Sequence, residues 1–231
     1  YPTALTSKVW GFNDVLMGAN PMRLERNLES YVMDNILYKV SFPAEFHAQT
    51  AAEAAISISK HLKGKLEEIE EILISTQEPG VRIISKKGPL TNYADRDHCI
   101  EYIVAWCLIN GNLDSNSYSN EAASDENIDV LRNITRTIED KKYTEKYYDL
   151  NKRAIPNKVT VKLKSGEIFE EEVLYPLGHK ERRDESKPFL REKFCKSIEN
   201  KDFDIAKLIS FYDENDLDSI NIYDLLDKIY K

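Results

Sequence analysis

The sequence predicts an α+β fold, in which an antiparallel sheet is covered by helices on one face and followed by a helical tail. Three observations support this class. An alanine-rich helical segment precedes a β-branched strand, a hairpin pattern lies further along the chain, and strands and helices do not alternate regularly. The pattern G-x-G-x-x-G is also absent, so a doubly wound parallel sheet that binds a dinucleotide is not favoured.

The first third of the chain contains an irregular stretch, a helix and a strand. Residues 1–35 mix turn signals with short apolar clusters and show no sustained period. The segment Pro43–Leu62 is rich in strong helix formers, and Ser41 is its candidate N-cap. The β-branched segment Ile69–Gln77 ends near the turn signal Glu-Pro-Gly, which predicts a strand.

The middle of the chain is predicted to be mainly helical. A second strong helix is expected over residues 94–110, because apolar residues dominate this segment and Gly111 follows it in the position that favours glycine. Apolar residues within 128–134 suggest a further helix whose end is not clear from the sequence.

The last part of the chain predicts a hairpin and then helices. Val159, Val161 and Leu163 alternate with polar residues, and a Lys-Ser-Gly turn precedes a second alternating segment. This pattern is typical of a hairpin with one apolar face. Residues 188–231 return to helical periodicity.

Composition and charge restrict the function classes. The chain has 231 residues, of which 42% are hydrophobic and 31% are charged, and its net charge is −8. An acidic chain is not expected to bind nucleic acid, and no apolar run approaches the ~20 residues that a membrane span needs. Cys99, Cys107 and Cys195 form no C-x-x-C pair, which predicts a reducing compartment without disulfides.

The first candidate constellation is Lys39, Glu45 and His47, which lie where the predicted first helix begins. Lys39 could extend to water or hold an anion. Glu45 could be a residue at the start of a helix that interacts with its dipole. His47 could be a hydrogen-bonded, partly buried residue or a general base. Residue types alone favour the structural interpretation of this group.

The second constellation lies in "KKGPLTNYADRDHCIEY". On a continuous helix Asp95, His98 and Tyr102 would share one face, and an acid, an imidazole and a phenol together form a plausible acid–base set. The alternative is a polar helix edge without a function. Lys86 and Lys87, just upstream, could hold a substrate with several carboxylates.

The third constellation is "YPLGHKERR", residues 175–183, a basic patch in an acidic chain. A solvated charge run and a domain-boundary turn with cations facing the substrate are both compatible with it. The histidines His47, His61, His98 and His179 form no H-x-x-x-H pair, so no metal site is predicted. Patterns typical of serine hydrolases and of P-loop proteins are also absent.

Five motifs occur in order between residue 1 and about residue 185: "YPTALTSKVWGF", "SYVMDNILYKVSFPAEFHAQTAAEAA", "KKGPLTNYADRDHCIEY", "DLNKRAIPN" and "YPLGHKERR". Together they resemble the 2-methylcitrate dehydratase family, the PrpD branch of the MmgE/PrpD superfamily. The resemblance implies dehydration of 2-methylcitrate to 2-methyl-cis-aconitate in the methylcitrate cycle of propionate breakdown, with no iron–sulfur cluster and no other cofactor. It also implies a cytoplasmic location in bacteria or the mitochondrial matrix in fungi.

The family architecture places the active site between a large all-helical domain and a smaller α+β domain. By resemblance, residues 1–35 end the all-helical domain, residues 36–180 form the α+β domain and residues 181–231 are a C-terminal helical return. The flanking helical segments therefore belong to the all-α domain. The expected partners are a small tricarboxylate, the absent N-terminal helical domain and a second copy in a homodimer. The chain alone is expected to carry an incomplete, inactive site.

The resemblance also implies roles for individual residues. Lys39 and Tyr102 match positions that relatives use in the substrate pocket. His47 is the histidine of the motif that contains Lys39, and Arg96 and His98 lie beside Tyr102 in its motif. The hypothesis is that Lys39 and Arg96 bind carboxylates, that His98 or His47 transfers a proton, and that Tyr102 positions or protonates the leaving hydroxyl.

Two other functions stay open at this point. One is a related enzyme that hydrates, decarboxylates or epimerises another polycarboxylate. The other is a catalytically silent module that serves only folding or dimerisation.

Overall fold

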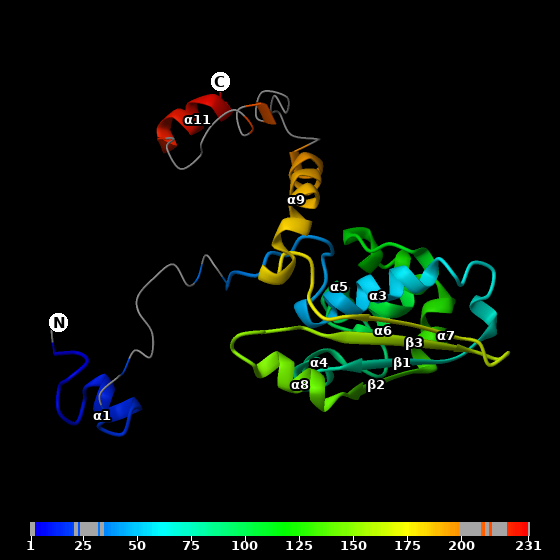
Figure 1. Ribbon diagram of the computed structural model, residues 1–231, viewed down its shortest axis with the longest axis horizontal. Helices are drawn as coiled ribbons and strands as arrows, with labels where there is room; N and C mark the ends of the chain where they lie inside the picture. The colour runs from blue at the N-terminus through cyan, green and yellow to red at the C-terminus, as the bar shows by residue number, and fades with distance from the viewer. Residues whose placement is uncertain are drawn as a thin grey trace. The chain divides into compact units, whose positions relative to one another are not determined.

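The computed structural model of this protein describes residues 3–20, 23, 32, 35–198, 209–210, 213 and 221–230 (Figure 1). The chain divides into two compact units, Tyr1–Ile36 and Leu37–Lys231. Helix α1 (Phe12–Leu16) belongs to the first unit, in the stretch that was predicted to be irregular. Within the described ranges, no helix is both long enough and apolar enough to cross a membrane.

The second unit is built on a four-stranded sheet with the order β2-β1-β3-β4. Strand β3 pairs antiparallel with both β1 and β4, whereas β2 pairs parallel with β1. The α+β class is confirmed. The sheet was predicted to be antiparallel but is mixed, because β2, which the sequence interpretation missed, pairs parallel with β1. The strands are β1 (Ile69–Thr76), β2 (Thr135–Glu139), β3 (Asn157–Leu163) and β4 (Ile168–Val173).

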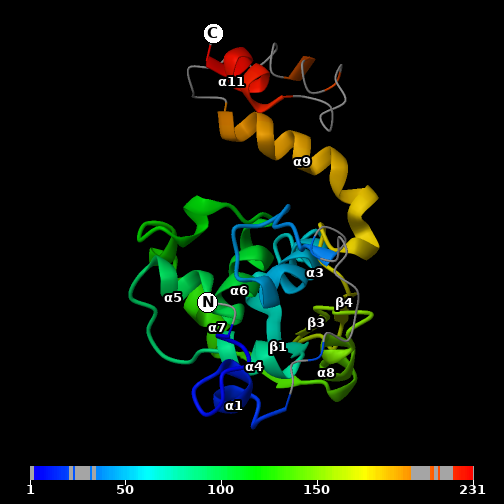
Figure 2. The same ribbon diagram turned by 90° about the vertical axis from the view of Figure 1, so that its left-hand side faces the viewer.

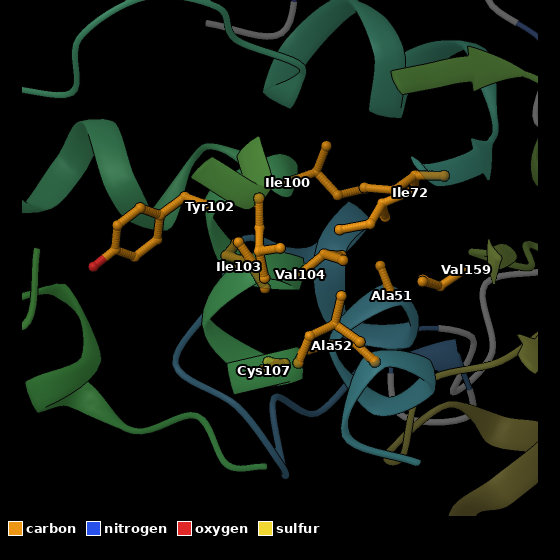
Figure 3. Packing of buried hydrophobic residues seen from close by; sticks show 14 of the residues in the cluster. Ala51, Ala52, Ile72, Ile100, Tyr102, Ile103, Val104, Cys107 and Val159 are labelled. Carbon is orange, nitrogen blue, oxygen red and sulfur yellow. The ribbon is translucent and has the colours of Figure 1, made fainter. Parts of the chain in front are cut away.

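The core lies between one face of this sheet and the helices α3 (Gln49–Ser59) and α6 (Ile100–Asn110) (Figures 1 and 2). Small side chains on α3 allow this helix to approach its neighbours closely. Its alanines are fully buried, namely Ala51, Ala52, Ala54 and Ala55. Strand β3 has the predicted alternation, with its three apolar residues buried. Figure 3 shows Ala51, Ala52, Ile72, Ile100, Val104 and Val159 within this core.

The first predicted helix begins later than expected. A short 3₁₀ turn, η1 (Phe46–Ala48), precedes α3. The prediction that Ser41 caps this helix is wrong, since the Ser41 hydroxyl has no hydrogen-bond partner among the described residues. The Glu45 side chain caps the turn instead, by accepting a hydrogen bond from the His47 amide. A carboxylate is a strong acceptor at this position.

The structure corrects two further expectations, one about a turn and one about a helix. The Glu-Pro-Gly segment is not a turn but the start of α4 (Glu78–Ile84), in which proline occupies the first turn where its missing amide is tolerated. The helix expected over residues 94–110 is broken into α5 (Tyr93–Asp97) and α6, with His98 and Cys99 between them. Gly111 ends α6 with φ of 68°, as predicted.

The remaining elements connect and flank these. Parallel strands need a long crossover, and α4 to α7 lie in the crossover between β1 and β2. The other described elements are η2 (Leu66–Glu68), η3 (Ser115–Tyr118), η4 (Ala122–Ser124), α7 (Glu126–Asn133), α8 (Lys141–Tyr148), η5 (Lys180–Arg182), α9 (Arg183–Ile198) and α11 (Ile222–Tyr230). The helical prediction for residues 188–231 is therefore confirmed over α9 and α11, and the rest of that range lies largely outside the described residues.

The segments that lead into and out of the α+β region lie side by side. The Tyr38 amide donates to the Gly178 carbonyl over 3.3 Å. Gly178 has φ of 92°, and a β-carbon at this position would overlap the Tyr38 carbonyl oxygen. Arg182 adds an ion pair with Glu53 of α3 at 2.9 Å. The basic motif of residues 175–183 is therefore held to the segment around Tyr38 by a backbone hydrogen bond and to α3 by an ion pair.

Candidate functional site

His47 and Glu45 form a close pair at the start of η1. Nδ1 of His47 lies 2.8 Å and 2.9 Å from the two carboxylate oxygens of Glu45. Both side chains are largely covered, with 12% and 16% of their surface exposed. Because an ionised carboxylate can only accept hydrogen bonds, Nδ1 carries the proton, and Nε2 of the neutral ring is the basic nitrogen.

The environment keeps the Glu45 carboxyl ionised. Burial acts to raise its pKa, but the hydrogen bond and the charge of His47 act in the opposite direction, with a smaller contribution from His98, and the pKa is lowered overall. An ionised carboxylate beside an imidazole fixes its tautomer and stabilises its protonated form. The pair is therefore equipped for proton transfer.

A second pair of the same type lies beside the first. Nδ1 of His98 is 2.6 Å from the Asp97 carboxylate. The Glu45 amide donates to the Asp97 carbonyl over 3.3 Å, which joins the start of η1 to the end of α5. We refer to Glu45, His47, Asp97 and His98 as the histidine–carboxylate cluster. It brings together two of the predicted site residues, His47 and His98.

The predicted acid–base face of Asp95, His98 and Tyr102 does not form, because the break between α5 and α6 separates these residues. Asp95 accepts hydrogen bonds from Thr91 instead. His98 pairs with its neighbour Asp97, in the break between the two helices. The sequence interpretation assumed one continuous helix and therefore paired His98 with Asp95 instead of Asp97.

Tyr102 and Arg96 lie inside the fold. The Tyr102 hydroxyl donates to the Ser117 carbonyl over 2.7 Å, and burial raises its pKa to about 12. Arg96 donates to the Tyr118 carbonyl and to the Asn120 side chain, at 2.7 Å and 3.0 Å. Figure 3 shows the Tyr102 ring pointing away from Ala52 and Val104. Both residues hold the segment around η3.

The three predicted lysines are distributed over different contacts. Nζ of Lys39 lies 4.9 Å from the centre of the Phe46 ring, a cation–π contact next to His47. Nζ of Lys86 lies 4.0 Å from Asp95, and Nζ of Lys87 donates to the Thr135 carbonyl over 2.8 Å. Of these three, Lys39 is the one whose described contact is with a residue of η1.

Two residues of this region were missed by the sequence interpretation. Tyr147 of α8 is 100 positions from His47 along the chain, and its hydroxyl lies 3.3 Å from Nε2 of His47. Glu101 of α6 is buried and accepts hydrogen bonds from Ser85, Thr137 and the Lys86 amide. Tyr147 lies two positions before the recognised motif "DLNKRAIPN", and this proximity is the signal that could have drawn attention to it.

The described residues contain no group of three or more histidine, cysteine, aspartate or glutamate side chains that could hold a metal ion. The histidine–carboxylate cluster instead joins each imidazole to one carboxylate by a hydrogen bond. What this arrangement can do chemically is accept and donate protons at two neighbouring imidazoles.

Comparison with known proteins identifies the family. The sequence family described as the MmgE/PrpD C-terminal domain matches residues 42–201. A relative from Yarrowia lipolytica named "2-methylcitrate dehydratase, mitochondrial" is 51% identical over 201 residues, which cover 85% of this chain and 39% of the relative. The Escherichia coli (strain K12) protein named "2-methylcitrate dehydratase" is 48% identical over 198 residues, covering 84% of this chain and 41% of the relative.

A third relative, from Saccharomyces cerevisiae and named "Probable 2-methylcitrate dehydratase", is 49% identical over 206 residues. The chain thus spans about two fifths of the length of these relatives, from 39% to 41%. The matched region contains every residue of the histidine–carboxylate cluster. The chain belongs to the MmgE/PrpD family and carries its C-terminal domain.

Proposed function

We propose that this chain is part of a 2-methylcitrate dehydratase, a hydro-lyase that eliminates water from 2-methylcitrate to give 2-methyl-cis-aconitate. The observation that carries the proposal is the histidine–carboxylate cluster, within a region about half identical to relatives that bear this name. Elimination of water requires one group that removes a proton next to a carboxylate and another that protonates the leaving hydroxyl. Two neighbouring imidazoles can supply both.

The two histidines differ in their exposure, which suggests different roles. His98 is 48% exposed at its side chain, whereas His47 is 12% exposed. We assign His98 to the removal of the substrate proton, since it is open to an incoming ligand. His47, covered and held by Glu45, is assigned to supply the proton that the leaving group needs, either directly or through a neighbouring group.

Cations beside the cluster would hold the substrate carboxylates. Lys39 is the nearest candidate along the chain, and the protein offers its ammonium group at the face of Phe46. Lys86 and Lys87 remain candidates for a further carboxylate, in a segment that Glu101 fixes. Such cations also stabilise the negative charge that develops on the substrate during proton removal.

The contacts of Arg96 and Tyr102 support an indirect role for both. Each donates a hydrogen bond to a backbone carbonyl of the η3 segment, and each is at least 95% covered from solvent. We propose that they position this segment rather than contact the substrate. This proposal replaces the direct roles that the resemblance alone implied.

Because the chain spans only about two fifths of its relatives, we expect it to be inactive alone and to need the remaining part of the polypeptide as a partner. A homodimer is proposed as the working assembly. The mitochondrial matrix or the bacterial cytoplasm is the proposed location, and the name of the Yarrowia lipolytica relative supports the former.

The test uses the completed polypeptide, meaning this chain joined to the part of its relatives that it does not span. Turnover is followed by the ultraviolet absorbance of the carbon–carbon double bond conjugated to a carboxylate, with 2-methylcitrate, citrate and cis-aconitate offered separately. This absorbance rises when 2-methylcitrate or citrate is dehydrated and falls when cis-aconitate is hydrated. Preferred turnover of 2-methylcitrate supports the proposal. Preferred turnover of citrate or cis-aconitate would identify a related polycarboxylate enzyme, and no turnover of any of the three would favour a silent dimerisation module.

A further inference from the structure

Tyr147 is the phenol that lies next to the basic nitrogen of His47. Its hydroxyl is 3.3 Å from Nε2, and the two rings are tilted by 36° with their centres 5.6 Å apart. Since Nδ1 is committed to Glu45, Nε2 is the nitrogen through which His47 can pass a proton onward. Glu45, His47 and Tyr147 thus form a continuous hydrogen-bonded relay.

Helix α8 is fixed in the position that this contact requires. The Tyr143 hydroxyl donates to Glu172 of β4 over 2.6 Å, and the Thr144 hydroxyl accepts a hydrogen bond from the Glu78 amide at the start of α4 over 2.9 Å. The Asp140 side chain caps the helix by accepting from the Lys142 amide. These anchors lie on two different elements, so the position of Tyr147 is set by tertiary structure.

The electrostatic environment keeps Tyr147 protonated. Burial, then the neighbouring Tyr148 and the charge of Glu45, raise its pKa. Tyr147, like His47 and Glu45, is partly exposed. A neutral phenol in this position can give its own proton to a ligand while it receives another from the imidazole behind it.

We propose that Tyr147, and not Tyr102, is the catalytic residue that protonates the leaving hydroxyl. The step begins with His47 carrying a proton on both nitrogens. The carbon–oxygen bond of the substrate breaks, its electron pair stays with the departing oxygen, and that oxygen takes the Tyr147 proton and leaves as water. Nε2 of His47 gives its proton to the Tyr147 oxygen, so the phenol is restored and His47 ends neutral.

The electron pair of the broken carbon–hydrogen bond forms the new double bond, and the base that removes that proton carries it away. This base is His98 in the proposed function, so the inference rests on that proposal. Glu45 is a positioning residue in this scheme, because it acts on the substrate only through His47.

The kinetic test compares Tyr147→Phe with Tyr148→Phe in the completed polypeptide. Tyr148 is the matched control, because its hydroxyl donates to Glu78 over 3.2 Å on the exposed side of the same helix. We expect Tyr147→Phe to lower kcat roughly 10²–10⁴-fold with little change in KM, as loss of a general acid does. Tyr148→Phe should leave kcat unchanged.

A second pair of variants separates chemistry from structure. Replacement of Tyr147 by 3-fluorotyrosine makes the phenol more acidic without removing it, so the basic limb of the pH profile of kcat should move to lower pH. The same replacement at position 148 should move the profile by much less, because Tyr148 acts only through its influence on the pKa of Tyr147. A purely structural role of Tyr147 would move neither limb.

A third measurement needs no activity and uses the 231-residue chain itself. In nitrogen NMR spectra of the histidine rings, loss of the phenol in Tyr147→Phe should move the Nε2 resonance of His47 downfield, and Tyr148→Phe should not. An unmoved Nε2 resonance in Tyr147→Phe would contradict the hydrogen bond and overturn the inference.

The kinetic outcomes distinguish the two proposals. If the completed wild-type polypeptide converts 2-methylcitrate and Tyr147→Phe keeps its full kcat, the assignment of Tyr147 is wrong while the proposed function stands. If the wild-type polypeptide converts no 2-methylcitrate, the proposed function fails, and the role of Tyr147 fails with it.

Discussion

The Glu45 carboxylate accepts hydrogen bonds from both the backbone amide and the ring of His47, at 2.7 Å and 2.8 Å. One side chain therefore caps η1 and sets the tautomer of the histidine. Loss of the carboxylate would affect the stability of the fold and the chemistry of the ring together.

Glu45→Gln should weaken the fold in a pH-dependent way. Because the pKa of Glu45 is lowered in the folded protein, the unfolded chain binds the extra proton first as the pH falls. The stabilisation is thus complete above the unfolded value of 4.5 and is lost as the pH falls through the folded value. We expect the variant to lose roughly 1.5–3 kcal/mol near neutral pH, the range for hydrogen bonds to charged groups.

Urea unfolding of the chain between pH 7 and pH 3 measures this effect. Glu121→Gln is the control, since Glu121 is an exposed carboxylate outside the cluster. Equal losses of unfolding free energy in the two variants at neutral pH would contradict a special role of Glu45 in stability.

Gly178→Ala should destabilise the contact between the segment around Gly178 and the segment around Tyr38. Gly178 and Gly166 both have positive φ, at 92° and 88°, so alanine is strained at either position, by roughly 1–2 kcal/mol. At Gly178 the added methyl group would also overlap the Tyr38 carbonyl, whereas at Gly166 nothing lies within 4 Å. Thermal unfolding should show a larger drop in Tm for Gly178→Ala, and equal drops would argue against the close approach.

Glu101→Ala should be among the more damaging substitutions in the core. Its buried carboxylate accepts from Ser85, Thr137 and the Lys86 amide at 2.6, 2.8 and 3.1 Å. Truncation leaves these donors without their acceptor, at a cost of roughly 1–3 kcal/mol for each donor that stays buried. Glu101→Gln keeps the shape and one acceptor oxygen, so urea unfolding should show a smaller loss; a larger loss for Gln than for Ala would contradict this account.

His179 should make the fold sensitive to mild acid. Burial lowers the pKa of this side chain, which also accepts a hydrogen bond from the Glu181 amide. The unfolded chain therefore binds a proton first as the pH falls through 6.5, and the stability that His179 contributes above that pH is progressively lost. His179→Asn retains a side-chain acceptor without the titration, so its unfolding free energy should vary less between pH 7 and pH 5; unchanged pH dependence would contradict the role of His179.

The sequence was sufficient where local pattern determines structure. The alternation of Val159, Val161 and Leu163 predicted a buried strand face, and Gly111 predicted a helix end, because both depend on near neighbours along the chain. Strand β2 was missed because its five residues, Thr-Arg-Thr-Ile-Glu, are mostly polar and half exposed. Hydrogen bonding to β1 makes this segment a strand, although its own sequence does not indicate one.

The contacts within the candidate site were predicted only in part, for a similar reason. His47 and His98 lie in recognisable motifs, but their carboxylate partners depended on where α5 ends and on how η1 begins. Tyr147 is 100 positions from His47 along the chain. Contacts of that kind arise from the packing of α8 against the sheet and α4, and periodicity along the sequence carries no information about them.

The most direct test of the account is turnover of 2-methylcitrate by the completed polypeptide with His47→Gln, compared with His61→Gln. His61 stacks on Phe169 with ring centres 5.7 Å apart and lies outside the histidine–carboxylate cluster. The account predicts that His47→Gln lowers kcat roughly 10²–10⁴-fold, whereas His61→Gln retains wild-type turnover. Full activity of His47→Gln would contradict it.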